Sequence, residues 1–320
     1  MIVLSDSEVR EAVSYKEIIE AVEEALLIYE EGSFYMPERM HADYKGNTLL
    51  LMPSFTDEYF GTKLVSIFPE NPEKGIPSLQ GVFVLNDGNT GAPLALMNAA
   101  KLTALRTAGV GALSTKYLTD MSIKNIGIIG AGVQGFHQAL FSTEIRSIEK
   151  IFVFDKNKET VKKFSEELKK LKPTVEIISA ENSEEVLINS DVIITATTSL
   201  TPVLPDKPEL FSGKHFIGIG SYKPEMREYP SALYKKVEAV FIDTKTAIKE
   251  SGDISFAIKE GLIGESKIRT LGDYIKKGEK ERFSTTFFKS VGMALFDLVV
   301  GSLIYEKALD KGLGKKVNLG

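Results

Sequence analysis

One stretch of the chain, residues 123 to 155, limits the possible folds more than any other. It reads as a strand over residues 123 to 129, a helix from Val133 to about Ile145 and a second strand over residues 151 to 154. Three glycines in the order G-x-G-x-x-G join the first strand to the helix: Gly130, Gly132 and Gly135. Asp155 follows the second strand, 20 residues after the last glycine. This order of strand, glycine turn, helix and distant acid is the fingerprint of a dinucleotide-binding fold.

Each glycine of the turn has its own mechanical purpose. Gly130 permits the tight turn, Gly132 lets the backbone approach a pyrophosphate, and Gly135 lets the helix pack on the strand. The backbone N–H groups at the start of the helix, including those of Val133 and Gln134, then face the anion. A glycine-rich turn without a ligand is the alternative, but the intact strand and helix context favours cofactor binding.

Asp155 bears on the choice of cofactor. A carboxylate there can accept hydrogen bonds from the adenosine ribose, whereas a 2′-phosphate would meet a like charge worth about 4 kcal/mol at roughly 4 Å and an effective dielectric constant of about 20. Half of that energy, about 2 kcal/mol, is roughly thirtyfold in affinity. The sequence therefore predicts that NAD(H) is preferred, with NADP(H) possible because the neighbouring Lys156 could reach a phosphate.

The composition and charge of the chain bear on its number of domains, its location and its partners. Of 320 residues, 43% are hydrophobic and 26% charged, and a chain of this length favours two domains. The net charge of −5 leaves no basic footprint for nucleic acid, and the lack of cysteine rules out disulfides and thiolate chemistry. Asp6 and Glu8 argue against a signal peptide, and the apolar stretch from Met293 to Tyr305 is interrupted by Asp297 and too short to span a bilayer. We expect a cytoplasmic protein with no nucleic-acid or membrane partner.

The chain before the glycine turn combines helices with a sheet. A helix is expected over residues 14 to 31, with Ser14 as its cap and Gly32 at its end, and a second one from Ala99 to Leu118. Between them the hydrophobic period changes to two, and a turn at residues 86 to 91 predicts a hairpin in an antiparallel sheet. The expected strands cover residues 47 to 52, 59 to 68, 80 to 86 and 92 to 97.

After the glycine turn, strands and helices alternate, which predicts a parallel sheet with right-handed crossovers. The expected elements are a helix over residues 160 to 171 and strands over residues 175 to 178, 191 to 197, 215 to 220 and 239 to 243. Ligands of such sheets bind at the carboxyl ends of the strands, where we expect Asp155, Thr197, Ser221 and Tyr222. The last helix, Ser290 to about Lys311, is apolar enough to pack on the N-terminal sheet or on a second subunit.

Three basic residues before the glycine turn are candidates for substrate chemistry. Arg106 lies in an apolar-faced helix and is either a snorkelling surface arginine or a bidentate partner for a substrate carboxylate. Lys63 lies among apolar strand residues and either points to solvent or, when buried, has a lowered pKa and moves protons. Arg39 belongs to the same strand region. The residues alone favour the surface reading of both the lysine and the arginine.

No other catalytic motif is present. The three histidines, His41, His137 and His215, fit no metal-binding spacing, so each is expected to be structural and no metal site is predicted. There is no G-x-S-x-G elbow and no G-x-x-x-x-G-K-[ST] loop, so hydrolase and nucleotide triphosphatase functions lack support.

Longer stretches of the chain resemble the ornithine cyclodeaminase and mu-crystallin family. They occur in order over nearly the whole chain, which is far more specific than the glycine fingerprint alone. The stretches are GTKLVSIFPEN around Lys63, GAPLALMNAAKLTALRTAG, IGIIGAGVQGFHQ, GIGSYKPEMRE, ESGDI and FKSVGMALFD.

This resemblance implies an α/β fold in which a doubly wound Rossmann domain is inserted into an α+β domain for substrate binding and dimerisation. The expected domains are residues 1–115 plus 290–320 for substrate and dimer contacts, and residues 116–289 for NAD. The resemblance also implies a homodimer. Positions matching Arg39, Lys63 and Arg106 hold the substrate carboxylate in the family, with the lysine close enough to exchange protons. This implication replaces the surface readings of the basic residues.

One position departs from the cyclodeaminases of the family. These enzymes carry an aspartate two residues after a strand-end glycine, where it acts on the side-chain amine of the substrate. This chain has Tyr222 two residues after Gly220. A tyrosine with a pKa of about 10 neither pairs strongly with an ammonium nor acts as a base at pH 7. Ring closure of ornithine is therefore not favoured, unless Asp253 or Glu225 replaces the missing carboxylate.

The second half of the cyclodeaminase reaction remains possible, namely the reduction of a C=N bond beside a carboxylate. The resemblance then points to ketimine reductases, which reduce Δ1-pyrroline-2-carboxylate to proline or its six-membered homologue to pipecolate. In this hypothesis Arg106 and Arg39 fix the carboxylate of a small imino acid, Lys63 supplies a proton, and Tyr222 or Ser221 shapes the pocket. Three alternatives stay open: alanine dehydrogenase, ornithine cyclodeaminase, and a nucleotide-binding dimer without turnover.

Overall fold

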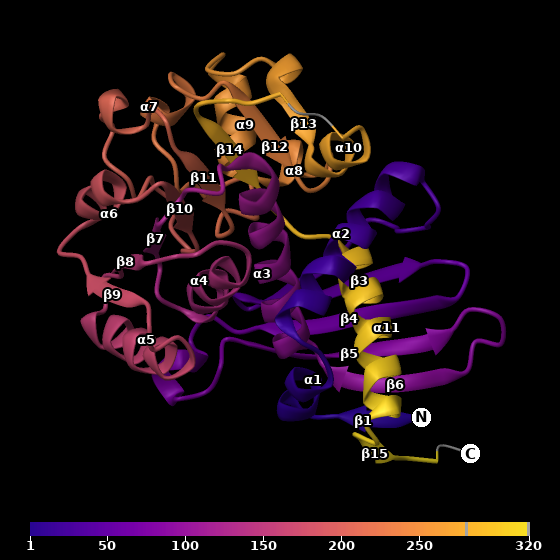
Figure 1. Cartoon of the computed structure of the whole chain (residues 1–320). Helices are drawn as coiled ribbons and strands as arrows, with labels where there is room; N and C mark the ends of the chain where they lie inside the picture. Colours follow the sequence, from indigo (N-terminus) through magenta and orange to yellow (C-terminus); the bar gives the residue numbers. More distant parts are fainter. Residues whose placement is uncertain (279–280, 319–320) are drawn as a thin grey trace. The chain divides into compact units, whose positions relative to one another are not determined.

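The computed structural model describes residues 1–278 and 281–318. The chain divides into two compact units, drawn in Figure 1: Met1–Arg106 with Met293–Gly320, here called the terminal unit, and Thr107–Gly292, the central unit. The boundaries expected from the sequence were after residue 115 and before residue 290, whereas the units divide after Arg106 and before Met293. Residues 279–280 and 319–320 of the expected domains lie outside the described residues.

The terminal unit is built on a seven-stranded sheet with the strand order β15-β1-β6-β5-β4-β3-β2. The strands are β1 (Ile2–Leu4), β2 (Met40–Tyr44), β3 (Asn47–Phe55), β4 (Tyr59–Ile67), β5 (Leu79–Asp87), β6 (Pro93–Asn98) and β15 (Lys315–Lys316). All neighbours pair antiparallel except β1 and β6, which are parallel. The four strands predicted from the sequence are β3 to β6, and the predicted hairpin is confirmed. Strands β1, β2 and β15 were not predicted. Strands β1 and β15 are very short and every residue of β2 is exposed, so none of the three shows an alternation of apolar and polar residues.

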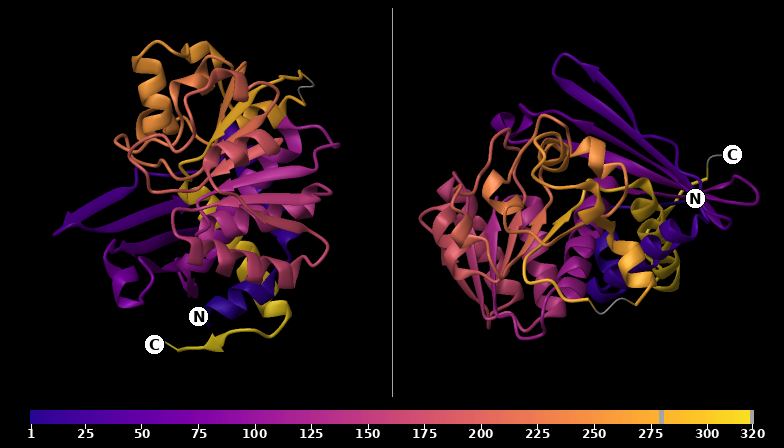
Figure 2. Two further views of the ribbon diagram at one scale, coloured as in Figure 1. Left: turned by 90° about the vertical axis from the view of Figure 1, so that its left-hand side faces the viewer. Right: turned by 90° about the horizontal axis from the view of Figure 1, so that it is seen from above.

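Helices α1 (Asp6–Ala12), α2 (Tyr15–Glu31) and α11 (Ala294–Asp310) pack in the same unit, and Figure 2 shows two further views of them. Ser14 caps helix α2 and Gly32 ends it, as predicted; the structure adds that Ser14 forms a capping box with Glu17 and that Gly32 lies in the left-handed region. Helix α11 contacts α2 and strands β3, β4 and β5, which confirms its predicted packing on the N-terminal sheet. It begins at Ala294 rather than Ser290, because the preceding strand β14 (Thr286–Lys289) and the turn after it use the intervening residues.

The central unit contains an eight-stranded parallel sheet with the order β13-β12-β14-β11-β10-β7-β8-β9. Its other strands are β7 (Asn125–Ile129), β8 (Lys150–Phe154), β9 (Glu176–Ser179), β10 (Val192–Thr195), β11 (His215–Gly218), β12 (Ala239–Ile242) and β13 (Ile268–Thr270). The strand order reverses beside β7, which confirms the predicted doubly wound Rossmann sheet. Strand β14 lies between β11 and β12 and was not predicted, since the four residues Thr286–Lys289 are too few to show a periodic pattern.

The remaining helices are α3 (Ala99–Leu118), which contains the boundary after Arg106, α4 (Val133–Ile145), α5 (Lys158–Leu171), α6 (Ser183–Asn189), α7 (Ser231–Tyr234), α8 (Ala247–Glu250), α9 (Gly252–Lys259) and α10 (Leu271–Lys276). The ranges expected for α3 and α4 agree with those observed. Among the helices that the structure describes, none is long and apolar enough to cross a membrane.

Arg146 closes the C-terminal end of α3 inside the central unit. Its Nη2 donates to the carbonyl oxygens of Thr115, Lys116 and Thr119, at 3.1, 2.7 and 3.1 Å, and its Nε donates to that of Asp120 at 3.2 Å. The last carbonyls of a helix have no intrahelical donor, so this side chain satisfies them.

We expect Arg146→Met to lower the free energy of unfolding by about 3 kcal/mol, because it removes a charged donor from several partly buried carbonyls. Urea unfolding measures the effect. Arg282→Met is the matched control, since the pair between Arg282 and Asp120, at 3.0 Å, is exposed and should be worth less than about 1 kcal/mol. Equal losses in the two variants would contradict the capping role.

Candidate active site

The glycine turn after β7 has the geometry that a dinucleotide requires. Gly130 has a φ of 97°, and a Cβ on it would lie 2.6 Å from the carbonyl oxygen of Ala196. A Cβ on Gly135 would lie 1.9 Å from the carbonyl oxygen of Gly130, so this glycine is needed for close packing of helix and strand. A Cβ on Gly132 would meet nothing within 4 Å. The space beside Gly132 is therefore open to an approaching phosphate, which a side chain at this position would obstruct.

The first turn of α4 offers donors to this open space. Gly132 caps the helix without a side chain, and the first intrahelical bond runs from Phe136 N to Gly132 O. The N–H groups before it, those of Val133 and Gln134 included, have no acceptor within the helix, and Val133 is 65% exposed. The turn and the helix start thus fit the pyrophosphate of a dinucleotide.

Asp155 lies at the carboxyl end of β8, next to the turn. Its Oδ2 accepts from Ala131 N at 2.9 Å and its Oδ1 accepts from Asn157 N at 2.9 Å. Each carboxylate oxygen can accept a second hydrogen bond, and the side chain is only partly buried. The arrangement fits the predicted recognition of the ribose hydroxyls.

A buried group of charges occupies the terminal unit. Lys63 of β4, Arg106 of α3 and Asp297 in the first turn of α11 meet there, with exposures of 2%, 6% and 0%. Lys63 Nζ lies 2.8 Å from Asp297 Oδ2, and Arg106 Nε donates to Asp297 Oδ1 at 3.1 Å. The surface readings of Lys63 and Arg106 are therefore wrong, because one carboxylate holds both side chains inside.

The lysine of this group has an altered proton affinity. Burial lowers the pKa of Lys63 from 10.5 to about 8, the Asp297 carboxylate opposes this, and the charges of Arg106 and Arg39 lower the pKa further. Arg39 is half-buried and near enough for its charge to act on the lysine. A lysine of this kind holds a proton at pH 7 and can release it with little cost.

The guanidinium of Arg106 has unused capacity. Its Nε is engaged by Asp297, whereas its two Nη atoms make no hydrogen bond to any residue that the structure describes. A guanidinium edge with two parallel donors matches a carboxylate. Since the two cations Lys63 and Arg106 share the single carboxylate of Asp297, this part of the terminal unit favours the binding of an anion.

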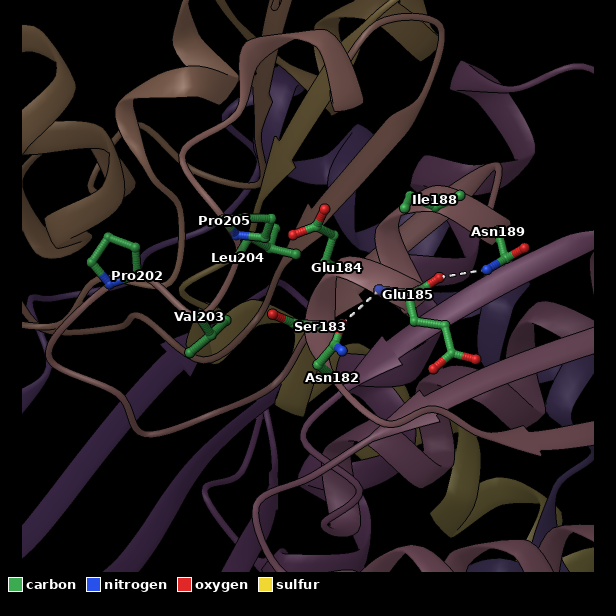
Figure 3. Close-up of a pocket in the computed structure, with 10 residues that line it drawn as sticks. All are labelled: Asn182, Ser183, Glu184, Glu185, Ile188, Asn189, Pro202, Val203, Leu204 and Pro205. Carbon is green, nitrogen blue, oxygen red and sulfur yellow. Dashed lines mark hydrogen bonds between the residues drawn. The ribbon is translucent and has the colours of Figure 1, made fainter.

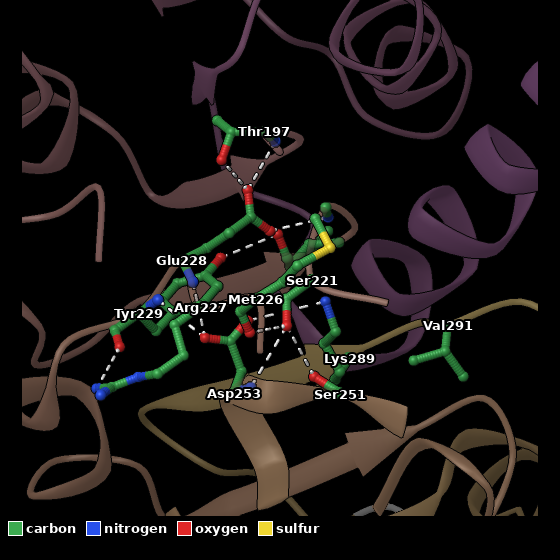
Figure 4. A network of polar contacts seen from close by, with 12 residues as sticks. Thr197, Ser221, Met226, Arg227, Glu228, Tyr229, Ser251, Asp253, Lys289 and Val291 are labelled. Atoms are coloured by element: carbon green, nitrogen blue, oxygen red, sulfur yellow. Dashed lines mark hydrogen bonds and ion pairs between the residues drawn. The ribbon is translucent and has the colours of Figure 1, made fainter. Parts of the chain in front are cut away.

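The predicted rim residues Thr197, Ser221 and Tyr222 follow strands of the central sheet, as Figure 4 shows for the first two. Glu228 Oε1 accepts from both the N–H and the hydroxyl of Thr197, at 2.7 and 2.8 Å. Ser221 is fully buried, and its hydroxyl donates to the carbonyl oxygen of Met226 at 2.7 Å. Tyr222 is half-buried, and burial with the nearby Glu225 raises its pKa, so the phenol stays protonated at pH 7.

Asp297 and Glu228 lie in these buried groups although no sequence motif predicted them. Asp297 was noted only because it interrupts an apolar stretch, although an ionisable residue inside a buried helix is itself a signal of a charged partner. Asp253, considered as a replacement carboxylate, is fully buried, and its Oδ1 accepts from the N–H groups of Glu228 and Tyr229 at 2.9 and 3.0 Å. Glu225 is exposed.

Two of the three histidines, His137 and His215, lie in structural positions, whereas His41 is exposed on β2. His215 is buried between the hydroxyls of Ser114 and Thr286, at 3.2 and 2.7 Å, and burial lowers its pKa to about 3. His137 Nδ1 lies 2.8 Å from the carbonyl oxygen of Val133. Within the described residues, no group of three or more histidine or acidic side chains could hold a metal ion.

The central unit also has a shallow depression of about 570 Å³ between α6 and residues 202–205, shown in Figure 3. Its lining includes Ile188, Leu204 and Glu184. None of the site residues predicted from the sequence lines it, so we assign it no part in the chemistry.

Comparisons of the sequence and the fold with known proteins identify the family of this chain. The model of the ornithine cyclodeaminase/mu-crystallin family matches residues 1–312. A Δ1-pyrroline-2-carboxylate reductase of Bacillus cereus is 33% identical, over 99% of this chain and 99% of the relative. The solved structure of Thermococcus litoralis Δ1-pyrroline-2-carboxylate reductase, in complex with NADH and L-proline, is 39% identical with a TM-score of 0.93, covering 99% of this chain and 100% of that one. An archaeal alanine dehydrogenase dimer with bound NAD is 31% identical with a TM-score of 0.91, covering 100% and 99%. The chain therefore belongs to the ornithine cyclodeaminase/mu-crystallin family.

Proposed function

We propose that the protein uses NADH to reduce the C=N bond of a cyclic imino acid, Δ1-pyrroline-2-carboxylate or Δ1-piperideine-2-carboxylate, to L-proline or L-pipecolate. Two of the compared proteins are Δ1-pyrroline-2-carboxylate reductases, one of them solved with NADH and L-proline. The observation that carries the proposal is the buried group of Lys63, Arg106 and Asp297. It joins a guanidinium suited to a carboxylate to a lysine suited to proton transfer.

In this reaction the residues of the terminal unit bind the substrate and move a proton. Arg106, with the charge of Arg39, holds the substrate carboxylate and so fixes the orientation of the ring. Lys63 gives a proton from Nζ to the ring nitrogen, where the new N–H bond forms. Asp297 keeps Lys63 and Arg106 in place. NADH, when bound, supplies the hydride for the carbon beside the carboxylate.

The fit of the glycine turn and Asp155 supports NADH as the cofactor. We expect NADPH to bind at least about tenfold more weakly than NADH, because its 2′-phosphate meets the Asp155 carboxylate. Asp155→Asn should narrow this difference, since the amide oxygen can still accept a backbone N–H while the charge is gone. Fluorescence titration with both cofactors measures the ratio of their dissociation constants. Tighter binding of NADPH than of NADH to the parent protein would contradict the predicted preference.

Alanine dehydrogenase is the second candidate, because an archaeal member of that class is 31% identical over the whole chain. It would perform the same reduction on an open-chain imine formed from pyruvate and ammonia. Ornithine cyclodeaminase is disfavoured. Tyr222 is not a base at pH 7, Asp253 is fully buried with its Oδ1 accepting from two backbone N–H groups, and Glu225 is exposed.

A substrate panel with the purified protein separates these functions. Loss of NADH absorbance is followed with Δ1-pyrroline-2-carboxylate, with Δ1-piperideine-2-carboxylate, and with pyruvate plus ammonia, and proline release from ornithine is assayed separately. We expect the cyclic imino acids to give the highest kcat/KM. Tight NADH binding without turnover of any substrate would contradict the proposal and favour a nucleotide-binding dimer.

We also propose that the protein is a homodimer joined through the outer face of the seven-stranded sheet. Met40 and Leu64 share that face because both stand opposite Leu51 in the strand register, whereas Lys63 points to the buried side. Leu49 and Leu64 are each 38% exposed and Met40 is 57% exposed. The archaeal alanine dehydrogenase named above is a dimer.

Leu64→Glu should raise the dimer dissociation constant at least about a hundredfold, because each copy would bury an unpaired carboxylate in the interface, a cost of about 3 kcal/mol. Light scattering gives the molar mass as a function of concentration. Leu171→Glu is the control, since Leu171 is a 51% exposed leucine on α5 of the central unit. A parent protein that is monomeric, or a Leu64→Glu dimer as tight as the parent, would refute this interface.

A further inference from the structure

Lys289 is a buried charge that the proposed reaction does not use. It ends β14 in the middle of the central sheet and is 0% exposed. Its Nζ lies 3.8 Å from Asp253 Oδ2, and neither atom makes a hydrogen bond to any other part of the described chain. Gly218 stands opposite it on β11, where a Cβ would come within 3.1 Å of the lysine stem. The fold therefore has room for a buried lysine at this position. Because the burial of a charge costs free energy, we expect this charge to have a specific role.

A chain of contacts leads from Lys289 to the carboxyl ends of two neighbouring strands (Figure 4). Asp253 Oδ1 accepts from the N–H of Glu228 at 2.9 Å. Glu228 Oε1 accepts from Thr197 N at 2.7 Å, and its Oε2 accepts from Gly220 N at 2.8 Å. One buried carboxylate thus joins the segment after β10 to the segment after β11.

The segments that Glu228 joins, after β10 and after β11, are closely packed. A Cβ on Gly220 would lie 2.0 Å from the carbonyl oxygen of Thr197 and 2.6 Å from Glu228 Oε1. A Cβ on Gly252, next to Asp253, would lie 2.1 Å from the carbonyl oxygen of Met226. Two glycines therefore allow the acid-bearing segments to approach closely, and a displaced Glu228 would release the ends of both strands together.

Lys289 supplies a positive charge that partly offsets the buried carboxylates of this cluster. Burial raises the pKa of Glu228 and of Asp253, and the charge of Lys289 is the largest influence that lowers both. Burial lowers the pKa of Lys289, whereas the carboxylates of Asp253, Glu228 and Asp243, which follows β12, raise it. Without the ammonium, two carboxylates would lie buried together, and one of them would take up a proton or move toward solvent.

We infer that Lys289 is a positioning residue for cofactor binding: through Asp253 and Glu228, its charge holds the segments at Thr197 and Gly220 in the form that binds NADH. This inference rests on the cofactor part of the proposed function, because strand ends of a doubly wound sheet are where a dinucleotide binds. Lys289 itself needs no contact with the cofactor.

The test is a fluorescence titration of NADH on purified variants. Lys289→Met should raise the NADH dissociation constant at least tenfold and raise KM for NADH more than it lowers kcat. Lys214→Met is the matched control: Lys214 immediately precedes β11, at the opposite end of the strand, and its Nζ donates to Ser190 O at 2.6 Å. Its affinity for NADH should stay within threefold of that of the parent, with thermal unfolding recorded for both variants.

A double variant separates charge from packing. In Lys289→Met/Asp253→Asn, the amide oxygen can still accept from Glu228 N, while the unpaired charge is gone. NADH affinity should return to within threefold of the parent value. A double variant that binds no better than Lys289→Met would overturn the inference, because lost packing would then explain the loss of affinity.

Glu228→Gln tests the same chain of contacts if Lys289→Met does not fold, since the amide presents an NH₂ group where Oε1 or Oε2 accepts a backbone N–H. It should weaken NADH binding at least tenfold. Unchanged NADH affinity in this variant or in Lys289→Met would refute the inference. A parent protein that binds NADH but reduces no imino acid would instead refute only the proposed reaction.

Discussion

Replacing Lys63 by methionine should lower kcat for imino-acid reduction at least a hundredfold, while the NADH dissociation constant changes less than threefold. A positioned general acid typically contributes a factor of about 10² to 10⁴. Lys63 is buried beside Asp297 and Arg106 in the terminal unit, so water does not easily replace its proton. Steady-state kinetics with Δ1-pyrroline-2-carboxylate and a separate NADH titration measure the two quantities.

The pH dependence should identify the same lysine. The pKa of Lys63 is lowered to about 8, chiefly by burial, and the reaction needs its protonated form. Reduction should therefore lose kcat/KM as the pH rises through about 8, and keep it below that value. The residual activity of Lys63→Arg should lack this fall, because an arginine stays protonated over the whole range.

A charge-balanced variant controls for the acid that Lys63→Met leaves behind. Among the described residues, Asp297 would then keep Arg106 as its charged partner. Lys63→Met/Asp297→Asn removes both members of the ion pair and the proton source with them, so it should be as slow as Lys63→Met. Recovery of the parental kcat in this double variant would mean that Lys63 only neutralises Asp297.

Arg106→Ala should lower kcat/KM for the imino acid more than thirtyfold, which corresponds to at least about 2 kcal/mol of transition-state binding. The Nη edge of this guanidinium is the one we assign to the substrate carboxylate, so most of the loss should come from a higher KM. Inhibition by L-proline, which carries the same carboxylate, should weaken in parallel. Arg106 belongs to the terminal unit, so NADH affinity should change little.

Arg106→Lys distinguishes the shape of the side chain from its charge. Lysine keeps the positive charge but lacks the fork of parallel donors. We expect it to recover only part of the loss seen in Arg106→Ala. A near-normal kcat/KM in Arg106→Ala would remove this residue from the mechanism, whatever the lysine variant does.

The glycine turn could be derived from the sequence because its requirements are local. A positive φ at Gly130 and the close contact at Gly135 arise within a few residues of the chain, so the fingerprint predicts them directly. The capping box of α2 and the hairpin between β5 and β6 are local in the same sense. Family resemblance then supplied candidate roles for Arg39, Lys63 and Arg106.

The arrangement of the buried charges could not be derived in this way. Alternation along β4 shows that Lys63 and Leu64 face opposite sides of the sheet, but not which side is covered, and the residues alone favoured an exposed lysine. That choice is made by α11, which comes from the far end of the chain and brings Asp297 to both basic side chains. The burial and pairing of Lys289 could not be predicted for the same reason, since its strand enters the sheet between β11 and β12, out of sequence order. Turns and caps depend on neighbours in the chain, whereas the burial and pairing of a charge depend on contacts between distant segments, which exist only once the chain has folded.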